Sequence, residues 1–363
     1  MIRSQEMTAR ERLINALEGR EVDRIPWSPF LAYVWEHFPK DIQDRGQCEF
    51  LKEIGADPLW RGAVCPVAQS TPGMEIRNIE VSDGVITELV TPVGSIQLRY
   101  RLSSEGNTMF LVEHPLKSEE DFKVQLWIEE HTEIMMADQG PVSDALSWDG
   151  LVIGMMTPRS KTAFQLLVEH LVGTEELAYA LYDYPDTVES LLQAMVENDL
   201  KAVRLAAESD LQYFLTWEDS STQNYSPVMY RKYIAPEIRS FCDILAPYGK
   251  SYIQHACGHV KDLLPIMKES GVKAVESLAS PPTGNVEMAD ARGSLGADVG
   301  IIGGIEPTKF LNLSIRELEP YVEQVIADCS GGPFVLANSD SCPPGVSVEK
   351  FKLVGQIVRR MAG

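Results

Sequence analysis

One imidazole and two thiols, those of His255, Cys257 and Cys342, are side chains whose types suit metal chemistry. His255 and Cys257 stand at the end of the apolar run SYIQHACG, and Cys342 ends PFVLANSDSC. Zinc takes nitrogen and sulfur ligands in tetrahedral geometry, and three protein ligands leave a fourth position open for chemistry. The separation of 342 − 257 = 85 residues is too long for a zinc finger or ribbon. Two thiolates with an imidazole favour zinc over magnesium or calcium, so the sequence predicts a catalytic Zn2+ site.

Carboxylates stand at the ends of the same kind of apolar run. Glu276 lies in AVESLAS and Asp340 in NSDSC, and each is either a weak fourth ligand or the acceptor that orients His255. The adjacent Glu218 and Asp219 point to opposite faces of a strand, so that only one of them reaches a site. We predict Asp219 and Glu276 as catalytic residues. Structural capping of the loop TWEDSSTQNYSP is the alternative role for Asp219.

Eight short apolar runs alternate with amphipathic segments along the chain. Buried strands without polar alternation are typical of a parallel sheet covered by helices, and eight such units indicate a closed barrel. In such a barrel the carboxyl ends of all strands open on one face, where the βα loops build the active site. We therefore predict an α/β fold, a (β/α)8 TIM barrel, with strands in RIPWSPF and in residues 57–64, 151–156, 213–219, 251–258, 274–280, 299–306 and 333–342.

The helices and one insertion complete the predicted organisation. Residues 8–19 form an amphipathic N-terminal helical extension. Residues 74–113 alternate apolar and polar side chains between turn signals, which predicts an inserted β-meander. A single domain then spans residues 1–363. A helical segment is predicted to end near Gly55, and the other helices are predicted at residues 118–138, 160–172, 174–182, 185–208, 227–247, 259–270, 286–296, 314–328 and 347–361.

The charge balance excludes whole classes of partner. The chain has 32 Lys and Arg against 53 Asp and Glu, a net charge of −21. Such a chain repels phosphate backbones and anionic lipid surfaces, so we expect no nucleic acid and no membrane as partner. The charged N-terminus lacks the apolar core of a signal peptide, and no stretch approaches the roughly 20 apolar residues of a spanning helix. We expect a cytoplasmic protein whose six cysteines form no disulfide framework.

The segment from Tyr213 to Val286 resembles a known family. YFLTWEDSSTQNYSPVMYRKYIAP and SYIQHACGHVKDLLPIMKESGVKAVESL are similar to the uroporphyrinogen-decarboxylase-like superfamily, in particular to its zinc-containing methyltransferases that work with corrinoid proteins. That branch has a His-x-Cys-Gly strand end and a later Cys after the final strand, a pattern that His255, Cys257 and Cys342 match. The resemblance extends to the opening TARERLINALEGREVDRIP and to EHPLKSEEDF, and so covers most of the chain.

The resemblance implies methyl transfer between a small substrate and the cobalt of a corrinoid (cobalamin) carried by a partner protein. In one direction zinc acts as a Lewis acid on a methyl ether such as a methoxyaromatic. In the other it deprotonates a thiol of the coenzyme M type. The aromatic segment around residues 27–35 and the meander favour the first, an O-demethylase. We predict that Tyr33, Trp217 and Tyr225 line the substrate pocket, with core packing as the alternative.

Two further functions are open to a chain of this superfamily. Its decarboxylase binds a substrate with many carboxylates through an Arg-rich N-terminal segment, and needs no metal. The corresponding segment here, IPWSPFLAYVWEHFP, contains no Arg, which argues against porphyrinogen decarboxylation. The other function is a non-catalytic ligand-binding barrel, and the retained set of one imidazole and two thiols argues against it.

Overall fold

The computed structural model describes residues 6–103 and 109–362 of the chain. The chain divides into two compact units. The barrel unit comprises Met1–Val64, Asp138–Met155 and Ser209–Gly363, and the second unit comprises Cys65–Ala137 and Met156–Glu208. A single domain over residues 1–363 stays a prediction.

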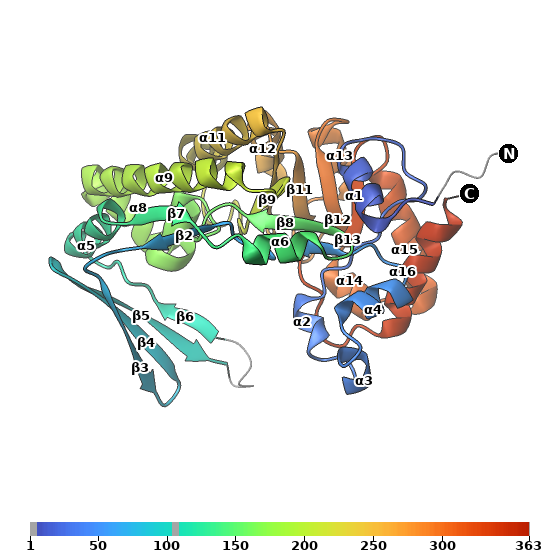
Figure 1. Cartoon of the computed structure of the whole chain (residues 1–363), viewed down its shortest axis with the longest axis horizontal. Helices are drawn as coiled ribbons and strands as arrows, with labels where there is room; N and C mark the ends of the chain where they lie inside the picture. Colours follow the sequence, from blue (N-terminus) through green and yellow to red (C-terminus); the bar gives the residue numbers. More distant parts are fainter. Residues whose placement is uncertain (1–5, 104–108, 363) are drawn as a thin grey trace. The chain divides into compact units, whose positions relative to one another are not determined.

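A parallel sheet of seven strands forms the centre of the barrel unit (Figure 1). Its order is β1 (Leu59–Arg61), β8 (Leu151–Met155), β9 (Tyr213–Thr216), β10 (Ser251–His255), β11 (Ala274–Leu278), β12 (Gly300–Ile305) and β13 (Phe334–Asn338). The segment at Trp27 takes the eighth position. Trp27 forms a parallel bridge with Leu336 of β13, and its carbonyl accepts a hydrogen bond of 2.7 Å from the N–H of Asp57, just before β1. The predicted (β/α)8 barrel is confirmed.

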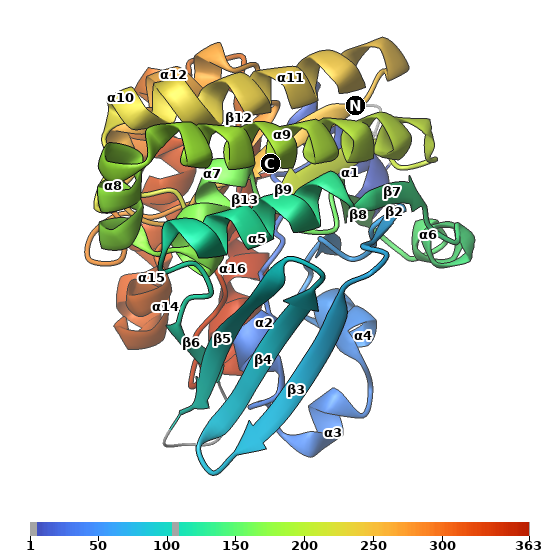
Figure 2. The same cartoon turned by 90° about the vertical axis from the view of Figure 1, so that its left-hand side faces the viewer.

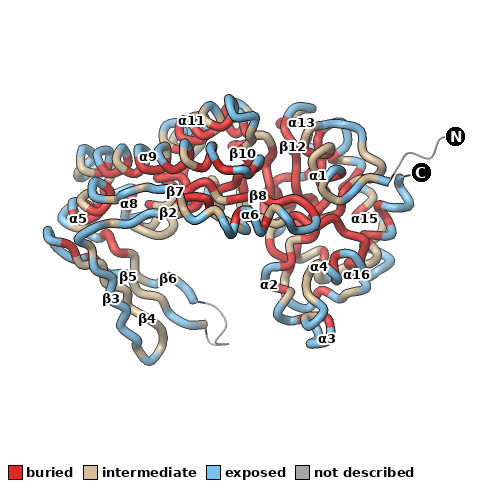
Figure 3. Tube along the Cα trace, viewed as in Figure 1, coloured by how far each residue is buried: buried red, intermediate tan, exposed pale blue. Residues whose placement is uncertain are grey.

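Burial explains why these short segments are strands. Every residue of β9, β11, β12 and β13 is buried, as strands between a barrel interior and a helical layer must be. Figure 3 shows the same burial along the centre of this unit. The predicted N-terminal helix is α1 (Ala9–Leu17), and its Leu13 and Leu17 join the buried cluster of inward-facing strand residues.

Helix α1 covers the amino ends of the strands. It begins at Thr8, whose side chain accepts from the Glu11 N–H in a capping box. Just after the helix, the Glu18 carboxylate accepts hydrogen bonds of 2.8 Å from Tyr213, which begins β9, and from Lys273, which precedes β11. The opposite mouth, where the strands have their carboxyl ends, is therefore the one that polar side chains can line.

The helices of the barrel unit follow the predicted pattern closely. Two of them, α6 and α14, were not predicted, because each has fewer than eight residues and so no clear periodicity. They are α2 (Ala32–Trp35), α3 (Lys40–Gln43), α4 (Gln47–Glu53), α6 (Gly140–Leu146), α10 (Pro227–Met229), α11 (Ala235–Leu245), α12 (Leu264–Glu269), α13 (Met288–Leu295), α14 (Pro307–Asn312), α15 (Ile315–Asp328) and α16 (Val348–Arg360).

The second unit contains the predicted meander, whose four antiparallel strands lie side by side in Figure 2. They are β3 (Glu75–Val81), β4 (Gly84–Thr91), β5 (Gly94–Leu102) and β6 (Met109–Glu113). Residues 104–108 of the predicted meander lie outside the described residues. The unit also contains β2 (Val67–Ser70), β7 (Glu133–Met136), α5 (Glu119–Glu130), α7 (Ala163–Leu166), α8 (Thr174–Asp183) and α9 (Pro185–Glu208).

One predicted helix is wrong in length. The helix expected over residues 118–138 ends at Glu130, and Glu133–Met136 pairs instead with β2 as an antiparallel strand. The helical periodicity is overridden here by pairing with a strand that lies far away in the sequence. Among the described residues, no helix is long and apolar enough to cross a membrane.

A buried cluster of charges ties α1 to the start of β1. The Arg12 guanidinium contacts Asp57 at 2.5 Å and Asp23 at 2.5 and 2.7 Å, and Arg24 adds bonds of 2.7 and 2.9 Å to Asp57. Burial raises the pKa of Asp23, but Arg12 and the N–H of Met7 lower it to a net value of about 2. The folded state therefore favours the ionised form of Asp23.

This shift predicts a pH-dependent stability. The pKa of Asp23 is depressed from 3.8 to about 2, so its contribution is complete above about pH 4 and is lost as the pH falls towards about 2. We expect Asp23→Asn to lower the urea midpoint at about pH 6. The difference in unfolding free energy between wild type and this variant should shrink by about 2 kcal/mol as the pH falls below about 4. Urea unfolding followed by circular dichroism measures this. Asp44→Asn, in an exposed pair with Lys40, is the control, and a pH-independent gap for Asp23→Asn contradicts the prediction.

Candidate metal centre

The end of β10 presents two donor side chains to one place. His255 is the last residue of the strand, and the Ala256 N–H still bonds to the Glu276 carbonyl of β11 at 2.8 Å. Gly258 then turns with φ 111°, and a Cβ there would lie 2.9 Å from the Ser220 carbonyl oxygen. Because residues two apart on an extended chain face the same side, the His255 ring and the Cys257 thiol point the same way.

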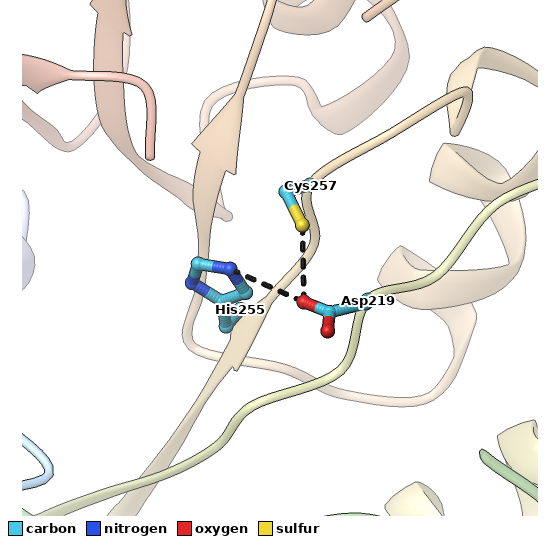
Figure 4. Close-up of side chains that lie close together, drawn as sticks. All are labelled: Asp219, His255 and Cys257. Carbon is cyan, nitrogen blue, oxygen red and sulfur yellow. Dashed lines mark hydrogen bonds and ion pairs between the residues drawn. The ribbon is translucent and has the colours of Figure 1, made fainter. Parts of the chain in front are cut away.

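The end of β9 adds a carboxylate. Glu218 is fully buried, whereas half of the Asp219 side chain is exposed, so the two neighbours do face opposite ways. The Cys257 thiol donates to Asp219 Oδ1 at 3.1 Å, and His255 Nε2 lies 3.8 Å from the same oxygen. Figure 4 shows the ring and the thiol converging on this carboxylate. Within residues 6–103 and 109–362, these are the three side chains whose donor atoms all lie within 4.8 Å of one another.

The other nitrogen of the ring is fixed from behind. His255 Nδ1 hydrogen-bonds to Glu276 Oε2, which also accepts from the Ser277 hydroxyl at 2.9 Å, while Arg61 Nε donates to Glu276 Oε1 at 2.8 Å. Burial raises the pKa of Glu276, but His255 and Arg61 lower it to about 2. Burial alone would lower the pKa of His255, but the neighbouring Glu276 carboxylate has the larger effect, so that the pKa of His255 is raised overall. Glu276 is thus an ionised acceptor, and Nε2 is the ring atom that faces Asp219 and Cys257.

The last barrel strand contributes Asp340 to the same charged group. Asp340 has φ 76°, and its N–H donates to the Ser277 hydroxyl at 3.0 Å. Burial raises the pKa of the Asp340 carboxyl, His255 lowers it, and the carboxylates of Glu276 and Asp219 raise it further. The Asp340 carboxyl therefore acts electrostatically on the same imidazole as Glu276 and Asp219.

The third predicted ligand, Cys342, is not part of the three-donor group. Its side chain is fully buried, its N–H donates to the Phe30 carbonyl at 2.9 Å, and burial raises the pKa of its thiol, which Lys350 lowers only in part. It does not join His255 and Cys257 in a three-donor group of the described residues, where Asp219 takes the third place.

The three predicted substrate residues have different surroundings. The Trp217 ring stands edge-on to the His255 ring at 5.1 Å between centroids, and it stacks on Phe30 at 5.8 Å with an angle of 12°. Tyr33 is 68% exposed. Tyr225 is buried and packs against Tyr230 at 6.2 Å. Trp217 is therefore the predicted aromatic residue that packs against the three-donor group.

Comparison with known families supports the position of this site in a barrel. The sequence profile of the uroporphyrinogen decarboxylase (URO-D) family matches residues 153–361, which is more than half of the 363 residues. The chain belongs to the uroporphyrinogen decarboxylase (URO-D) family. The matched region contains β9 to β13 and the end of β8, and therefore Asp219, His255, Cys257 and Glu276.

A solved methyltransferase has a similar fold. A methyltransferase from Methanosarcina mazei has a TM-score of 0.62 and 14% identity, with 99% of this chain and 100% of that chain covered. A B12-independent methionine synthase from Shewanella sp. W3-18-1 has a TM-score of 0.45 and 10% identity, covering 93% and 98%. At such identities the methyltransferase shows a shared fold. No curated protein matches the sequence.

Sequence reasoning missed one residue of this site, Arg61, which contacts Phe30 of the predicted aromatic segment around residues 27–35. Arg61 ends β1, and its guanidinium carbon lies 5.1 Å from the centre of the Phe30 ring. The strand-end rule did not select Arg61, because the strand was predicted to run over residues 57–64 and Arg61 lies in the middle of that range, whereas β1 ends at Arg61.

A glycine beside Arg61 allows Trp217 its place. Gly62 has φ +61°, and a Cβ there would lie 2.8 Å from Trp217 Cζ2, whereas Gly249 has φ +69° and no atom within 4 Å of such a Cβ. Alanine at either position adopts a strained backbone. We expect Gly62→Ala to lose about 1–3 kcal/mol more stability than Gly249→Ala, because only the first overpacks a ring. Urea unfolding and near-ultraviolet circular dichroism of the tryptophans measure this, and equal losses contradict the predicted contact.

Proposed function

We propose that the protein is a zinc-dependent methyltransferase, which moves a methyl group between a small substrate and the cobalt of a corrinoid protein. The observation that carries the proposal is the convergence of an imidazole, a thiol and a carboxylate at the ends of two adjacent barrel strands. Methyl transfer is chosen because a methyltransferase shares the fold over the whole chain. The corrinoid partner follows from the sequence resemblance.

The donor set fits zinc. Zinc accepts imidazole nitrogen, thiolate sulfur and carboxylate oxygen at about 2.0–2.3 Å, so tetrahedral ligand atoms stand about 3.5 Å apart. The separations of 3.1 Å between Cys257 Sγ and Asp219 Oδ1, and of 3.8 Å from that oxygen to His255 Nε2, bracket this value. Glu276 holds the far side of the His255 ring, as carboxylates do behind ligating histidines. Three donors leave one position for substrate.

The chain's own residues would divide the work around that ion. Bound zinc would supply Lewis acidity towards an ether oxygen, or would stabilise a thiolate. Glu276 accepts a hydrogen bond from the Nδ1–H of His255 and so keeps Nε2 facing the other donors. The Trp217 and Phe30 stack beside the ring offers a flat apolar surface. An aromatic methyl ether suits such a surface better than a small charged thiol, so the methoxyaromatic is the favoured substrate class.

The porphyrinogen decarboxylase alternative has weaker support. A substrate with many carboxylates needs cationic partners, and Arg61, the arginine of this site, is already committed. Its three nitrogens donate to Glu276, to the Leu59 carbonyl and to the Ser28 carbonyl.

Metal content tests the proposal first. We expect about one zinc per chain in purified protein, and Cys257→Ser to bind zinc more weakly by more than the 10–100-fold typical of outer-sphere changes. Cys342→Ser is the matched control, since it removes a thiol that lies outside the three-donor group. Zinc is measured by plasma mass spectrometry and by competition with a chromophoric chelator. A Cys342→Ser protein without zinc, beside an Asp219→Asn protein with zinc, would restore Cys342 as the ligand.

Activity then separates the two directions of transfer. With a Co(I) corrinoid protein and a methoxyaromatic, we expect loss of the ether and appearance of the methylcobalt absorption spectrum. With methylcobalamin and a thiol of the coenzyme M type, we expect no thioether above the level of Cys257→Ser. Thioether formation alone reverses the assignment, and no transfer in either mixture by zinc-loaded protein favours a non-catalytic barrel.

A further inference from the structure

Arg61 is anchored on three sides inside the barrel. Its side chain is 2% exposed. Nε donates to Glu276 Oε1 at 2.8 Å, Nη1 to the Leu59 carbonyl at 3.3 Å, and Nη2 to the Ser28 carbonyl at 3.1 Å. Strands β1 and β11 are not neighbours in the sheet, so this side chain crosses the interior from one strand to the other. A guanidinium held by three acceptors has one orientation.

The two oxygens of Glu276 are shared between Arg61 and His255. Arg61 binds Oε1, and His255 Nδ1 and the Ser277 hydroxyl bind Oε2. A carboxylate can rotate about its last side-chain torsion, which has a broad minimum. Fixing Oε1 fixes Oε2 as well, and with it the direction in which the His255 ring lies.

Two aromatic side chains form a second connection between Arg61 and His255. The Arg61 guanidinium lies over the Phe30 ring, Phe30 stacks on Trp217, and Trp217 stands edge-on to the His255 ring. Arg61 therefore reaches the imidazole by two routes, through Glu276 on its Nδ1 edge and through the stack on its face. An Arg guanidinium can hydrogen-bond in its plane and stack on its face at once, which a Lys ammonium cannot.

We infer that Arg61 is a positioning residue of the metal centre, which locks Glu276 and Trp217 so that the His255 imidazole presents Nε2 to the ion. This inference rests on the proposed function. It assigns Arg61 no contact with substrate. A purely structural Arg61 would stabilise the fold and leave the properties of a bound metal unchanged.

The experiment compares Arg61→Gln with a matched variant of another buried ion pair. Arg24→Gln removes an arginine that is 14% exposed and bonded to Asp57. Asp57 precedes β1 and Arg61 ends it, so the control removes a similar pair at the opposite end of the same strand. The readouts are the zinc dissociation constant by chelator competition, the visible spectrum of the Co2+-loaded protein, and the thermal midpoint by circular dichroism.

We expect both variants to lower the thermal midpoint. Only Arg61→Gln is expected to weaken zinc binding, by about 10–100-fold, and to change the Co2+ bands, which depend on the geometry of the ligands. Arg61→Lys is the second variant. It should also weaken zinc binding and change the Co2+ bands, because an ammonium cannot make the three hydrogen bonds and the ring contact together. If Arg61→Gln does not fold, Arg61→Lys supplies the zinc dissociation constant and the Co2+ spectrum.

Wild-type zinc affinity and Co2+ spectrum in a folded Arg61 variant overturn the inference and leave the proposed function intact. Equal effects of the Arg24 and Arg61 variants on the metal also overturn it. A wild-type protein that binds no stoichiometric zinc overturns the proposed function itself, and the inference with it.

Discussion

The closure of parallel strands into a barrel is the constraint on which the candidate metal centre depends. His255 ends β10, Glu276 lies in β11, Arg61 ends β1, and Asp219 follows β9. Because every strand runs the same way, these ends share one mouth, although the residues are far apart in the sequence. Helix α1 occupies the other end with apolar side chains. The barrel thus separates a stabilising end from a chemical end.

The packed strands hold the buried charges at that mouth in place, and the charges contribute little to holding the strands together. Buried ion pairs contribute little net stability, since desolvation offsets most of their attraction. The side chains of Glu276 and Arg61 are both 2% exposed and form an ion pair at 2.8 Å. The nearby Asp340 adds a carboxyl group whose pKa is raised by burial. Such a concentration of perturbed groups is typical of functional sites. The packed strands around it supply the stability that the cluster itself does not.

The barrel could be predicted from the sequence because each of its strands is a short apolar run. The rule that polar residues at the carboxyl ends of these strands form the site identified His255, Cys257, Asp219 and Glu276. The strand-end rule is less informative where the backbone leaves the strand. After β13 the chain passes through Asp340 with φ 76°, so alternation no longer tells which side chain faces the mouth, and Cys342 lies outside the three-donor group. The surroundings of Tyr33 and Tyr225 depend on loop and helix packing, which periodicity does not encode. The strand at Glu133–Met136 depends on a distant partner.

The three donor side chains differ in how firmly they are held, and this difference bears on the chemistry. His255 is 4% exposed in its side chain and fixed through Glu276, whereas the Asp219 side chain is 50% exposed. A ligand on a solvated loop end can move away at small cost, because water replaces its contacts. A buried ligand cannot. The site therefore combines a rigid side, made by Arg61, Glu276 and His255, with a solvent-exposed, adjustable side at Asp219.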